Sequence, residues 1–291
     1  MNVAASIRAR LTNISRNENI AFQVIIVRYL HERLLYRLSR SRFVNQLYLK
    51  GGNLLYILQG ISTRPTVDVD FLGHSLSGEP TSIKNMMEEI ASISCNDGVW
   101  FDTRNIFIER LTGQNLYSGI RLVFPAGFHT IKQNLQIDIG FGDRVIPNPV
   151  RLNFPVLLDD LPVPEILAYT PETVIAEKFH AMIELSVFNS RMKDFFDVYQ
   201  LLETEQYDDK ILKQAVSATF QNRQTFFSEN HALFTDEFAN DTQRNRDWQA
   251  FLKKINRGAS LQFPKVMKEI TRAMKPICGF LPTGTTQQVA P

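Results

Sequence analysis

Two aspartates in one apolar run are the residues of this 291-residue chain that most clearly suggest chemistry. Asp68 and Asp70 stand in "TVDVDFLG", where alternating polar and apolar residues predict a strand. Side chains alternate between the faces of a strand, so both carboxylates point to one face while Val67, Val69 and Phe71 point into the core. Two carboxylates on one face can share divalent cations, and Mg²⁺ prefers hard oxygen ligands together with phosphate oxygens and water.

A third carboxylate would complete a site for two metal ions. Asp138 lies in the strand-like run "NLQIDIGFG", between two isoleucines that face the other way. Three such carboxylates could hold two ions that activate an attacking hydroxyl and stabilise a leaving pyrophosphate. The alternative is that these aspartates line a solvated sheet face. We prefer that alternative for Asp138 alone but not for Asp68 with Asp70, because two poor strand formers in one short strand need a reason.

A Gly-Gly turn precedes the aspartate strand. Gly51 and Gly52 end a short predicted strand and open a short predicted helix, where backbone N–H groups can approach a phosphate. Asn53 could add a side-chain donor, and Arg64 and Thr66 could contact a triphosphate from just before the aspartate strand. Most Gly-Gly pairs are only turns, and a loop arginine is usually just solvated. The position of the turn before the aspartate strand favours a nucleotide-binding role.

The elements that must position these residues change character along the chain. Helical spacing over about residues 20–38 and in "TSIKNMMEEIASI" predicts two helices, and strand-like runs follow between about residues 99 and 158. From Pro171 almost to the end the pattern is helical. The fold class is therefore α+β, with an α+β domain over residues 1–162 and a helical domain over 163–280. The composition of residues 281–291 predicts a disordered tail.

The overall composition is that of a soluble globular protein, with 44% hydrophobic and 21% charged residues. Two cysteines, Cys95 and Cys278, are too few for a disulfide framework and lack metal-site spacing, which suggests a reducing compartment. The N-terminus lacks a signal-peptide pattern, and the most apolar run, "IAFQVIIVRYL", is short and contains Arg28. We therefore predict a cytoplasmic protein without a membrane span.

Basic residues cluster near both ends. Residues 1–50 hold nine Lys or Arg against two acids, and residues 244–276 hold nine against two. Two such segments would suit a polyanionic partner. The alternative is that ordinary helices carry solvated cationic faces, since clustering in sequence is not clustering in space.

Two motifs resemble a known family. "KGGNLLYILQGISTRPTVDVDF" resembles the first motif of the polymerase-β-like nucleotidyltransferases, and more specifically that of the AbiEii/AbiGii toxins, which carry a Gly-Gly turn and an Arg-x-Thr-x-Asp-x-Asp-Phe strand. "AEKFHAMIELSVFNSRMKDFFDVYQL" resembles the later motif of that family, a lysine in one helix followed by Arg-x-Lys-Asp-x-x-Asp opening the next. Together with "LQIDIGF" the matches span residues 47–202.

The resemblance implies a nucleotidyltransferase core, with a mixed β-sheet flanked by helices, followed by a C-terminal helical bundle that completes the active site. It implies metal ligands, phosphate-contacting residues and an acid near the lysine: Asp68, Asp70 and Asp138 for the metal, Gly51, Gly52, Asn53 and Lys178 for the nucleotide phosphates, and Asp194 as the acid. Asp197 shares a helix face with Asp194, and we expect it to pair with Arg191 or Lys193. Wider superfamily members often have Gly-Ser where this chain has Gly52-Asn53, so no serine hydroxyl is available there.

The resulting expectation is a Mg²⁺-dependent enzyme that transfers a nucleoside monophosphate from an NTP to a hydroxyl, with two ions bound. The resemblance further implies a toxin of a bacterial toxin–antitoxin or phage-defence system, the acceptor end of tRNA as the target, and a separately encoded antitoxin. The alternatives are transfer to a protein or small molecule, or a catalytically weak nucleotide- or RNA-binding module. The aspartate pair argues against the module, which need not keep two repelling carboxylates.

Overall fold

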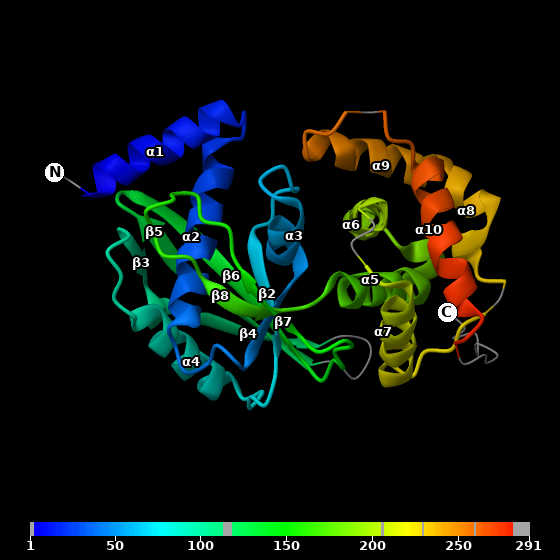
Figure 1. Ribbon diagram of the computed structural model, residues 1–291, viewed down its shortest axis with the longest axis horizontal. Helices are drawn as coiled ribbons and strands as arrows, with labels where there is room; N and C mark the ends of the chain where they lie inside the picture. Colours follow the sequence, from blue (N-terminus) through cyan, green and yellow to red (C-terminus); the bar gives the residue numbers. More distant parts are fainter. Residues whose placement is uncertain (1–2, 113–117, 205–206, 229, 259, 282–291) are drawn as a thin grey trace. The chain divides into compact units, whose positions relative to one another are not determined.

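The computed structural model describes residues 3–112, 118–204, 207–228, 230–258 and 260–281. The chain divides into two compact units (Figure 1): unit 1 is Met1–Asp143 with Pro149–Tyr169, and unit 2 is Arg144–Asn148 with Thr170–Pro291. The domain boundary predicted at residue 162 lies a few residues before Tyr169, where unit 1 ends, and falls in the loop before the last strand of that unit. Residues 282–291 of the expected disordered tail lie outside the described residues.

Unit 1 is built on a mixed eight-stranded sheet with the order β3-β5-β6-β2-β1-β8-β7, and β4 pairs with β5. The pairs β2–β6 and β1–β8 are parallel, and the remaining pairs are antiparallel. This confirms the mixed sheet expected of a nucleotidyltransferase core. The strands are β1 Leu47–Lys50, β2 Asp68–Gly73, β3 Val99–Phe101, β4 Phe107–Thr112, β5 Ser118–Phe128, β6 Ile131–Phe141, β7 Val150–Asn153 and β8 Glu165–Ala168.

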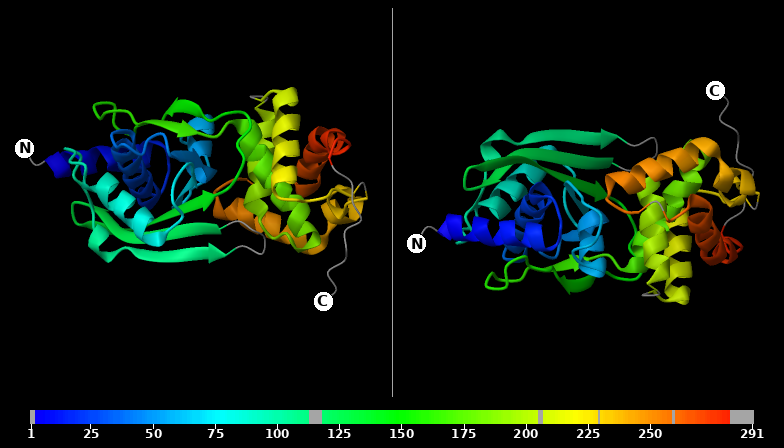
Figure 2. Two further views of the ribbon diagram at one scale, coloured as in Figure 1. Left: turned by 90° about the horizontal axis from the view of Figure 1, so that it is seen from below. Right: turned by 90° about the horizontal axis from the view of Figure 1, so that it is seen from above.

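Helices flank this sheet, as expected. The largely buried helix α2 packs against both β5 and β8, which lie in different halves of the sheet. Figure 2 shows how this is possible: the twisted sheet wraps around α2, so that strands pass on two sides of it. The helices of unit 1 are α1 Val3–Asn17, α2 Phe22–Ser39, α3 Gly51–Gln59 and α4 Pro80–Ser92, with a short 3₁₀ turn η1 Thr103–Asn105.

The two faces of the sheet differ sharply. On the face toward the core, Leu122, Ile137 and Val69 lie in register on β5, β6 and β2, and all three are fully buried. Burial of this apolar row stabilises the sheet and leaves the alternate residues, which are polar, on the other face. The start of β2 was predicted wrongly, because the strand begins at Asp68 and Val67 is 70% exposed. Val69 and Phe71 are buried, as predicted.

The basic N-terminal segment is partly internal. The guanidinium groups of Arg28, Arg33 and Arg37 on α2 are all buried. Arg28 donates to the carbonyls of residues 61 and 63, Arg33 to that of residue 162, and Arg37 forms an ion pair of 2.7 Å with Asp97. Both interpretations of this segment, a polyanion-binding surface and a solvated helix face, are therefore wrong for these three arginines. They hold loops onto α2 instead.

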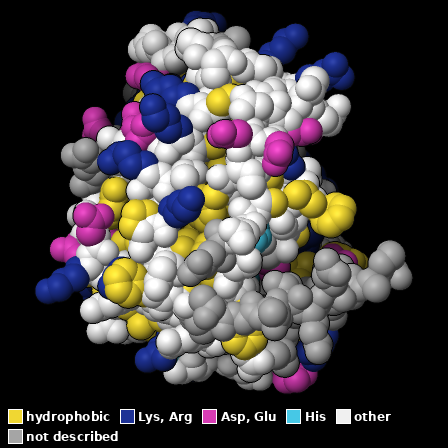
Figure 3. Space-filling view, turned by 90° about the vertical axis from the view of Figure 1, so that its right-hand side faces the viewer, with side chains coloured by type: hydrophobic (Ala, Val, Ile, Leu, Met, Phe, Trp, Pro, Cys, Tyr) yellow, Lys and Arg dark blue, Asp and Glu magenta, His cyan; other side chains and the backbone are white. Residues whose placement is uncertain are grey.

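Unit 2 is helical, as the sequence pattern predicted. Its centre is a cluster of aromatic rings that includes Trp248, Phe195 and Phe263, with ring centroids 5.2 to 5.5 Å apart. Its elements are α5 Pro171–Leu185, η2 Ser186–Phe188, α6 Met192–Glu203, α7 Asp209–Asn222, η3 Ala232–Phe234, α8 Asp236–Asn240, α9 Thr242–Lys254 and α10 Phe263–Cys278. On the face seen in Figure 3, basic side chains are interspersed with acidic and apolar ones.

In the described ranges of the chain, none of the helices combines the length and the hydropathy that crossing a bilayer requires.

Candidate active site

Three carboxylates meet on the polar face of the sheet in unit 1. Asp68 and Asp70 lie on β2, and Asp138 lies on the neighbouring parallel strand β6, in register with Asp70. One carboxylate oxygen from each lies within 4.8 Å of the others, and all three side chains are partly accessible. These three residues form what we call the carboxylate cluster. The geometry brings together the three aspartates that the sequence singled out.

The cluster is the middle of a longer row of charges that crosses five strands in register. From β4 to β1 the row runs Glu109, Arg121, Asp138, Asp70 and Lys50. Residues opposite each other on paired strands share a face and lie about 5 Å apart. The order of charges is therefore negative, positive, negative, negative, positive. Two adjacent carboxylates, which repel each other, are bracketed by one cation on each side.

Arg121 contacts its neighbour Asp138 directly. Its Nε and Nη2 donate to the two carboxylate oxygens of Asp138 at 2.8 and 2.7 Å. This planar, bidentate arrangement is the strongest geometry available to an arginine–carboxylate pair. The side-chain hydrogen bond to Asp138 raises the pKa of Arg121, which stays charged. The amide nitrogen of Gln136 also donates to Asp138, at 3.2 Å.

Lys50 occupies the other end of the row. Its ammonium lies 3.3 Å from a carboxylate oxygen of Asp143, just beyond β6, and 5.4 Å from the ring centre of Tyr169. A side chain added at Gly140 would come within 3.8 Å of the same nitrogen. The lysine therefore reaches across β2 and over β6, along the edge of the carboxylate cluster.

The Gly-Gly turn makes room for the cluster. Gly51 has φ +66°, a conformation that side chains rarely adopt, and a Cβ placed there would overlap the carboxylate of Asp70. A Cβ at Gly52 would lie 2.6 Å from the side chain of Thr66, whose hydroxyl donates to Asp68. Both glycines therefore allow α3 to begin directly against the aspartate strand. The backbone of the turn lies beside the carboxylates, and its predicted contact with phosphate stays a prediction.

Asn53 holds the backbone of the aspartate strand β2. Its side chain is buried, its amide donates to the backbone carbonyl of Asp68 at 2.8 Å, and its oxygen lies 3.2 Å from Nδ1 of His31. Burial lowers the pKa of His31 to about 4, so the imidazole is neutral and can donate to Asn53. Both polar groups of the Asn53 side chain therefore have contacts inside the protein. The predicted contact of Asn53 with phosphate stays a prediction.

The donor set fits a hard divalent cation. Three carboxylates that are close together, partly solvated and supplied by rigid strands match the oxygen ligands that Mg²⁺ takes in proteins. The space that Gly51 leaves beside Asp70 would be closed by any side chain, so the structure keeps this carboxylate accessible.

The second predicted motif forms its own charged cluster in unit 2. The ammonium of Lys178 on α5 lies 2.7 Å from Asp194 and 2.8 Å from Asp197, both on α6. Arg191 pairs with the second oxygen of Asp194 at 2.7 Å. The expected pairing of Asp197 with Arg191 or Lys193 is therefore corrected: Arg191 binds Asp194, and Asp197 binds Lys178. Both carboxylates are buried, and the lysine is 14% exposed.

Comparison with known proteins now decides the family. The family described as the nucleotidyl transferase AbiEii toxin of type IV toxin–antitoxin systems matches residues 33–270. The chain belongs to the AbiEii family. Its fold is similar to that of JHP933 from Helicobacter pylori, with a TM-score of 0.52, 14% identity and coverage of 89% of this chain and 93% of that one. A second H. pylori structure, named only provisionally as a nucleotidyltransferase, gives a TM-score of 0.49, 14% identity and coverage of 89% and 96%. A search of curated proteins finds no match.

The sequence alone missed part of this candidate site. Arg121, Gln136 and Lys50 surround the carboxylate cluster, although none of them was singled out. Lys50 directly precedes the Gly-Gly turn and could have been noticed there. No pattern in the sequence around Arg121 points to the site, because Arg121 reaches Asp138 only through the pairing of β5 with β6. Arg64 lies in the loop before β2, and its predicted nucleotide contact stays a prediction.

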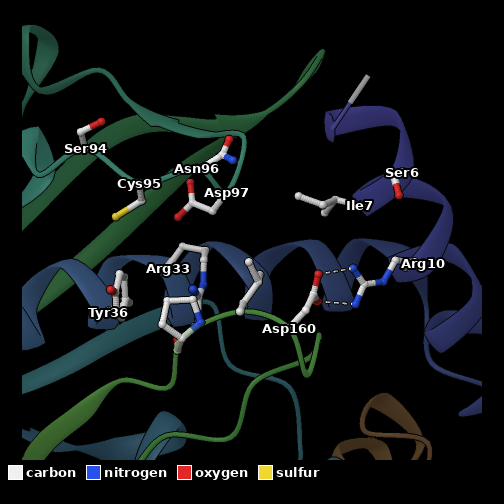
Figure 4. Close-up of a pocket in the computed structure, with 12 residues that line it drawn as sticks. Ser6, Ile7, Arg10, Arg33, Tyr36, Ser94, Cys95, Asn96, Asp97 and Asp160 are labelled. Atoms are coloured by element: carbon white, nitrogen blue, oxygen red, sulfur yellow. Dashed lines mark hydrogen bonds and ion pairs between the residues drawn. The ribbon is translucent and has the colours of Figure 1, made fainter. Parts of the chain in front are cut away.

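A separate cavity of about 600 Å³ lies elsewhere in unit 1, between α1, α2 and the loops at residues 94–97 and 160–162. Figure 4 shows that Arg10 and Asp160 pair across one of its walls. The carboxylate of Asp97, another lining residue, forms an ion pair with Arg37. Burial raises the pKa of Cys95 on its rim, so this thiol is a poor nucleophile. The cavity includes none of the carboxylate cluster.

Proposed function

We propose that this AbiEii-family chain transfers a nucleoside monophosphate from an NTP to a hydroxyl at the acceptor end of tRNA, with Asp68, Asp70 and Asp138 as ligands of two Mg²⁺ ions. The observation that supports it is the meeting of three carboxylates from two parallel strands within 4.8 Å, beside a turn without side chains. In the reaction, a bond forms between the acceptor oxygen and the α-phosphorus. The bond from that phosphorus to its bridging oxygen breaks, pyrophosphate leaves, and the hydroxyl proton passes to water.

The bound ions would neutralise phosphate charge and favour loss of the hydroxyl proton. The chain itself contributes position. Backbone N–H groups at Gly51 and Gly52 would hold phosphate oxygens at the start of α3, where the helix dipole also attracts negative charge. Arg64 and Thr66 would contact the triphosphate from the loop before β2. Fixed donors of this kind need no reorganisation during the reaction, which is why they lower the barrier.

Lys178 and Asp194 are proposed as nucleotide-site residues on the strength of the family motif. The ammonium of Lys178 is partly exposed and would contact nucleotide phosphates. The carboxylate of Asp194 is fully buried beneath it, so we assign it the role of holding the lysine in place. Asp197 shares this role from the next turn of α6.

As a member of a family of toxins, the protein is proposed to act in the cytoplasm, to be counteracted by a separately encoded antitoxin, and to serve in phage defence. Expression without an antitoxin should arrest growth. The Asp68→Ala variant should relieve that arrest if catalysis is the cause. Arrest that persists at equal protein levels would separate toxicity from nucleotidyl transfer.

The direct test incubates the protein with total tRNA, Mg²⁺ and each NTP, labelled at the α-phosphate in one set and at the γ-phosphate in another. Transfer of a nucleoside monophosphate places only the α-label in RNA, whereas phosphorylation would place only the γ-label there. Asp70→Asn should abolish transfer and leave the circular dichroism spectrum unchanged, while Asp159→Asn, at an exposed carboxylate, should behave as wild type.

Each other outcome points to a defined alternative. An α-label in protein or in a small molecule would move the acceptor away from tRNA. A folded protein that binds NTP but transfers no label would be a binding module. Full activity of Asp70→Asn would refute the metal-ligand assignment.

A further inference from the structure

We propose that Arg121 is a positioning residue whose guanidinium holds Asp138 until a divalent cation takes that carboxylate, and that Glu109 then receives the guanidinium. The inference rests on the proposed function, in which Asp138 is a metal ligand. It assigns a role to two residues on strands that the catalytic motifs do not include.

The first step of the argument is that Asp138 is already engaged. Both of its oxygens accept hydrogen bonds from Arg121, at 2.8 and 2.7 Å, and Gln136 donates to the same group. In this bidentate arrangement, the lone pairs of Asp138 that face the guanidinium already accept hydrogen bonds from it. A cation that binds Asp138 at these oxygens must also lie close to a guanidinium, which repels it. The cation and Arg121 therefore compete for one carboxylate.

The second step is that the cluster needs a cation in either state. Asp138 and Asp70 are directly opposite each other on paired strands, and like charges in that position destabilise a sheet. Asp68 adds a third negative charge within 4.8 Å. Arg121 offsets this repulsion while no metal is bound. A divalent ion offsets it more completely, and the arginine then becomes an excess positive charge.

The third step is that a second acceptor lies within reach. Glu109 on β4 is directly opposite Arg121 on the side away from Asp138, so the arginine stands between two carboxylates in register. The Arg121 side chain is 33% exposed and Glu109 is exposed, so no packed core blocks a rotation between them. The charges of both carboxylates act on Arg121 in the present arrangement. A long side chain pivoting about its own strand can exchange one for the other.

The same geometry predicts opposite effects for the two partners. Removing the arginine removes the competitor, so metal binding becomes tighter. Removing Glu109 removes the place to which the arginine retreats, so metal binding becomes weaker. If Arg121 served only to stabilise the sheet, removing it would weaken metal binding, because a disordered Asp138 binds metal less well.

The experiment measures Mn²⁺ affinity of the purified full chain, with free Mn²⁺ followed by electron paramagnetic resonance. Carboxylate sites that take Mg²⁺ also take Mn²⁺, so the ion is a suitable probe. Arg121→Gln should bind Mn²⁺ about tenfold more tightly, the equivalent of about 1.4 kcal/mol, whereas Arg121→Lys, which keeps the charge but not the fork, should lie between it and wild type. Glu109→Gln should bind several-fold more weakly. The matched control for Arg121→Gln is Arg110→Gln on β4, which removes the same positive charge from an arginine that pairs with Glu79, and it should not change affinity.

The double variant Glu109→Gln with Arg121→Gln decides whether Glu109 acts through the arginine. If it does, the double variant binds Mn²⁺ as tightly as Arg121→Gln alone. If Glu109→Gln weakens Mn²⁺ binding equally in the wild type and in Arg121→Gln, the effect comes from the distant charge of Glu109. The proposal that Glu109 accepts the guanidinium is then refuted. Unchanged or weaker binding by both Arg121 variants, with native circular dichroism, would refute the competition.

Failure of the underlying assignment has a different signature. If Asp138→Asn binds Mn²⁺ as wild type does, Asp138 is not a ligand, and the metal site of the proposed function is wrong whatever Arg121 does. If Asp138→Asn loses affinity but Arg121→Gln does not gain it, the metal site stands and only the role of Arg121 is refuted.

Discussion

Replacing Gly51 by alanine tests how the turn and the carboxylate cluster depend on each other. The added Cβ would lie 2.7 Å from Cγ of Asp70 and 2.9 Å from its Cβ, so the obstruction involves the whole side chain and not only its flexible end. The backbone at Gly51 has φ +66°, which any other residue adopts with strain. Asp70 must therefore rotate away from Asp68 and Asp138, or the turn must move.

The expected magnitude combines two costs. A left-handed backbone conformation costs a residue with a side chain about 1–2 kcal/mol, and forcing extra volume into a packed site costs about 1–3 kcal/mol. Gly51→Ala should therefore destabilise unit 1 by about 2–5 kcal/mol, which for a unit of this size lowers Tm by about 2–4 °C per kcal/mol. Displacing one carboxylate should weaken Mn²⁺ binding on the order of ten- to a hundredfold.

Gly60 provides a matched control. It ends α3 with φ +75°, and a Cβ built there would meet nothing within 4 Å. Gly60→Ala should therefore cost about 1–3 kcal/mol of backbone strain and leave Mn²⁺ affinity unchanged. Thermal unfolding and Mn²⁺ titration of both variants separate strain from obstruction. Wild-type Mn²⁺ affinity in Gly51→Ala would refute the reasoning, because it would mean that Asp70 tolerates a side chain in the turn.

Three further predictions concern buried charges. Lys178→Met leaves two buried carboxylates without their shared cation and should destabilise unit 2 by about 3–5 kcal/mol; denaturant unfolding checks this, with exposed Lys193→Met as the control, and equal stabilities would contradict it. Arg37→Met should lower the unfolding free energy of unit 1 by a similar amount, about 3–5 kcal/mol, because buried Asp97 loses a 2.7 Å ion pair. A shift in Tm below about 2 °C would show that the pair is dispensable. The pKa of His31 is lowered to about 4, so the folded state binds fewer protons than the unfolded state below pH 6.5. Stability should fall by up to about 3 kcal/mol between pH 6.5 and 4 relative to His31→Gln, and parallel pH profiles of the two proteins would rule this out.

What the sequence predicted well depends on local geometry. Alternation along a strand is a property of consecutive residues, so it was sufficient to place Asp68 and Asp70 on one face. It failed at Val67 because the strand begins one residue later, and strand ends are set by pairing with neighbours. The proximity of Asp138 requires β6 to lie parallel to β2, which no local pattern reveals. Alternation in its own run made Asp138 a candidate, and the family resemblance favoured it as the third ligand.

The role of Arg121 was hidden by an unusual hairpin. Strands β5 and β6 are joined through His129 and Thr130, and the pairing of Phe128 with Ile131 fixes Arg121 opposite Asp138. Short hairpins of this kind usually carry Asn-Gly or a similar pair, whereas here His129 itself adopts φ +54°. Without that signal the register could not be counted from the sequence.

The buried arginines of α2 show a second limit. A count of charges in residues 1–50 treats Arg28, Arg33 and Arg37 as equivalent to surface residues. Their burial depends on loops that supply carbonyls and a carboxylate from residues 61 to 162, far along the chain. Charge patterning along the sequence cannot anticipate partners that only the tertiary fold provides.

The parallel pairing of β2 with β6 also sets when the carboxylate cluster can first exist during protein synthesis. Two of its aspartates leave the ribosome with β2, but the strand that carries the third is translated only after α4, β3, β4 and β5. A nascent or prematurely terminated chain that ends before β6 holds two neighbouring carboxylates and no central partner strand. If the carboxylate cluster holds the metal ions as proposed, a chain that ends before β6 lacks one of the three ligands and cannot form that metal site.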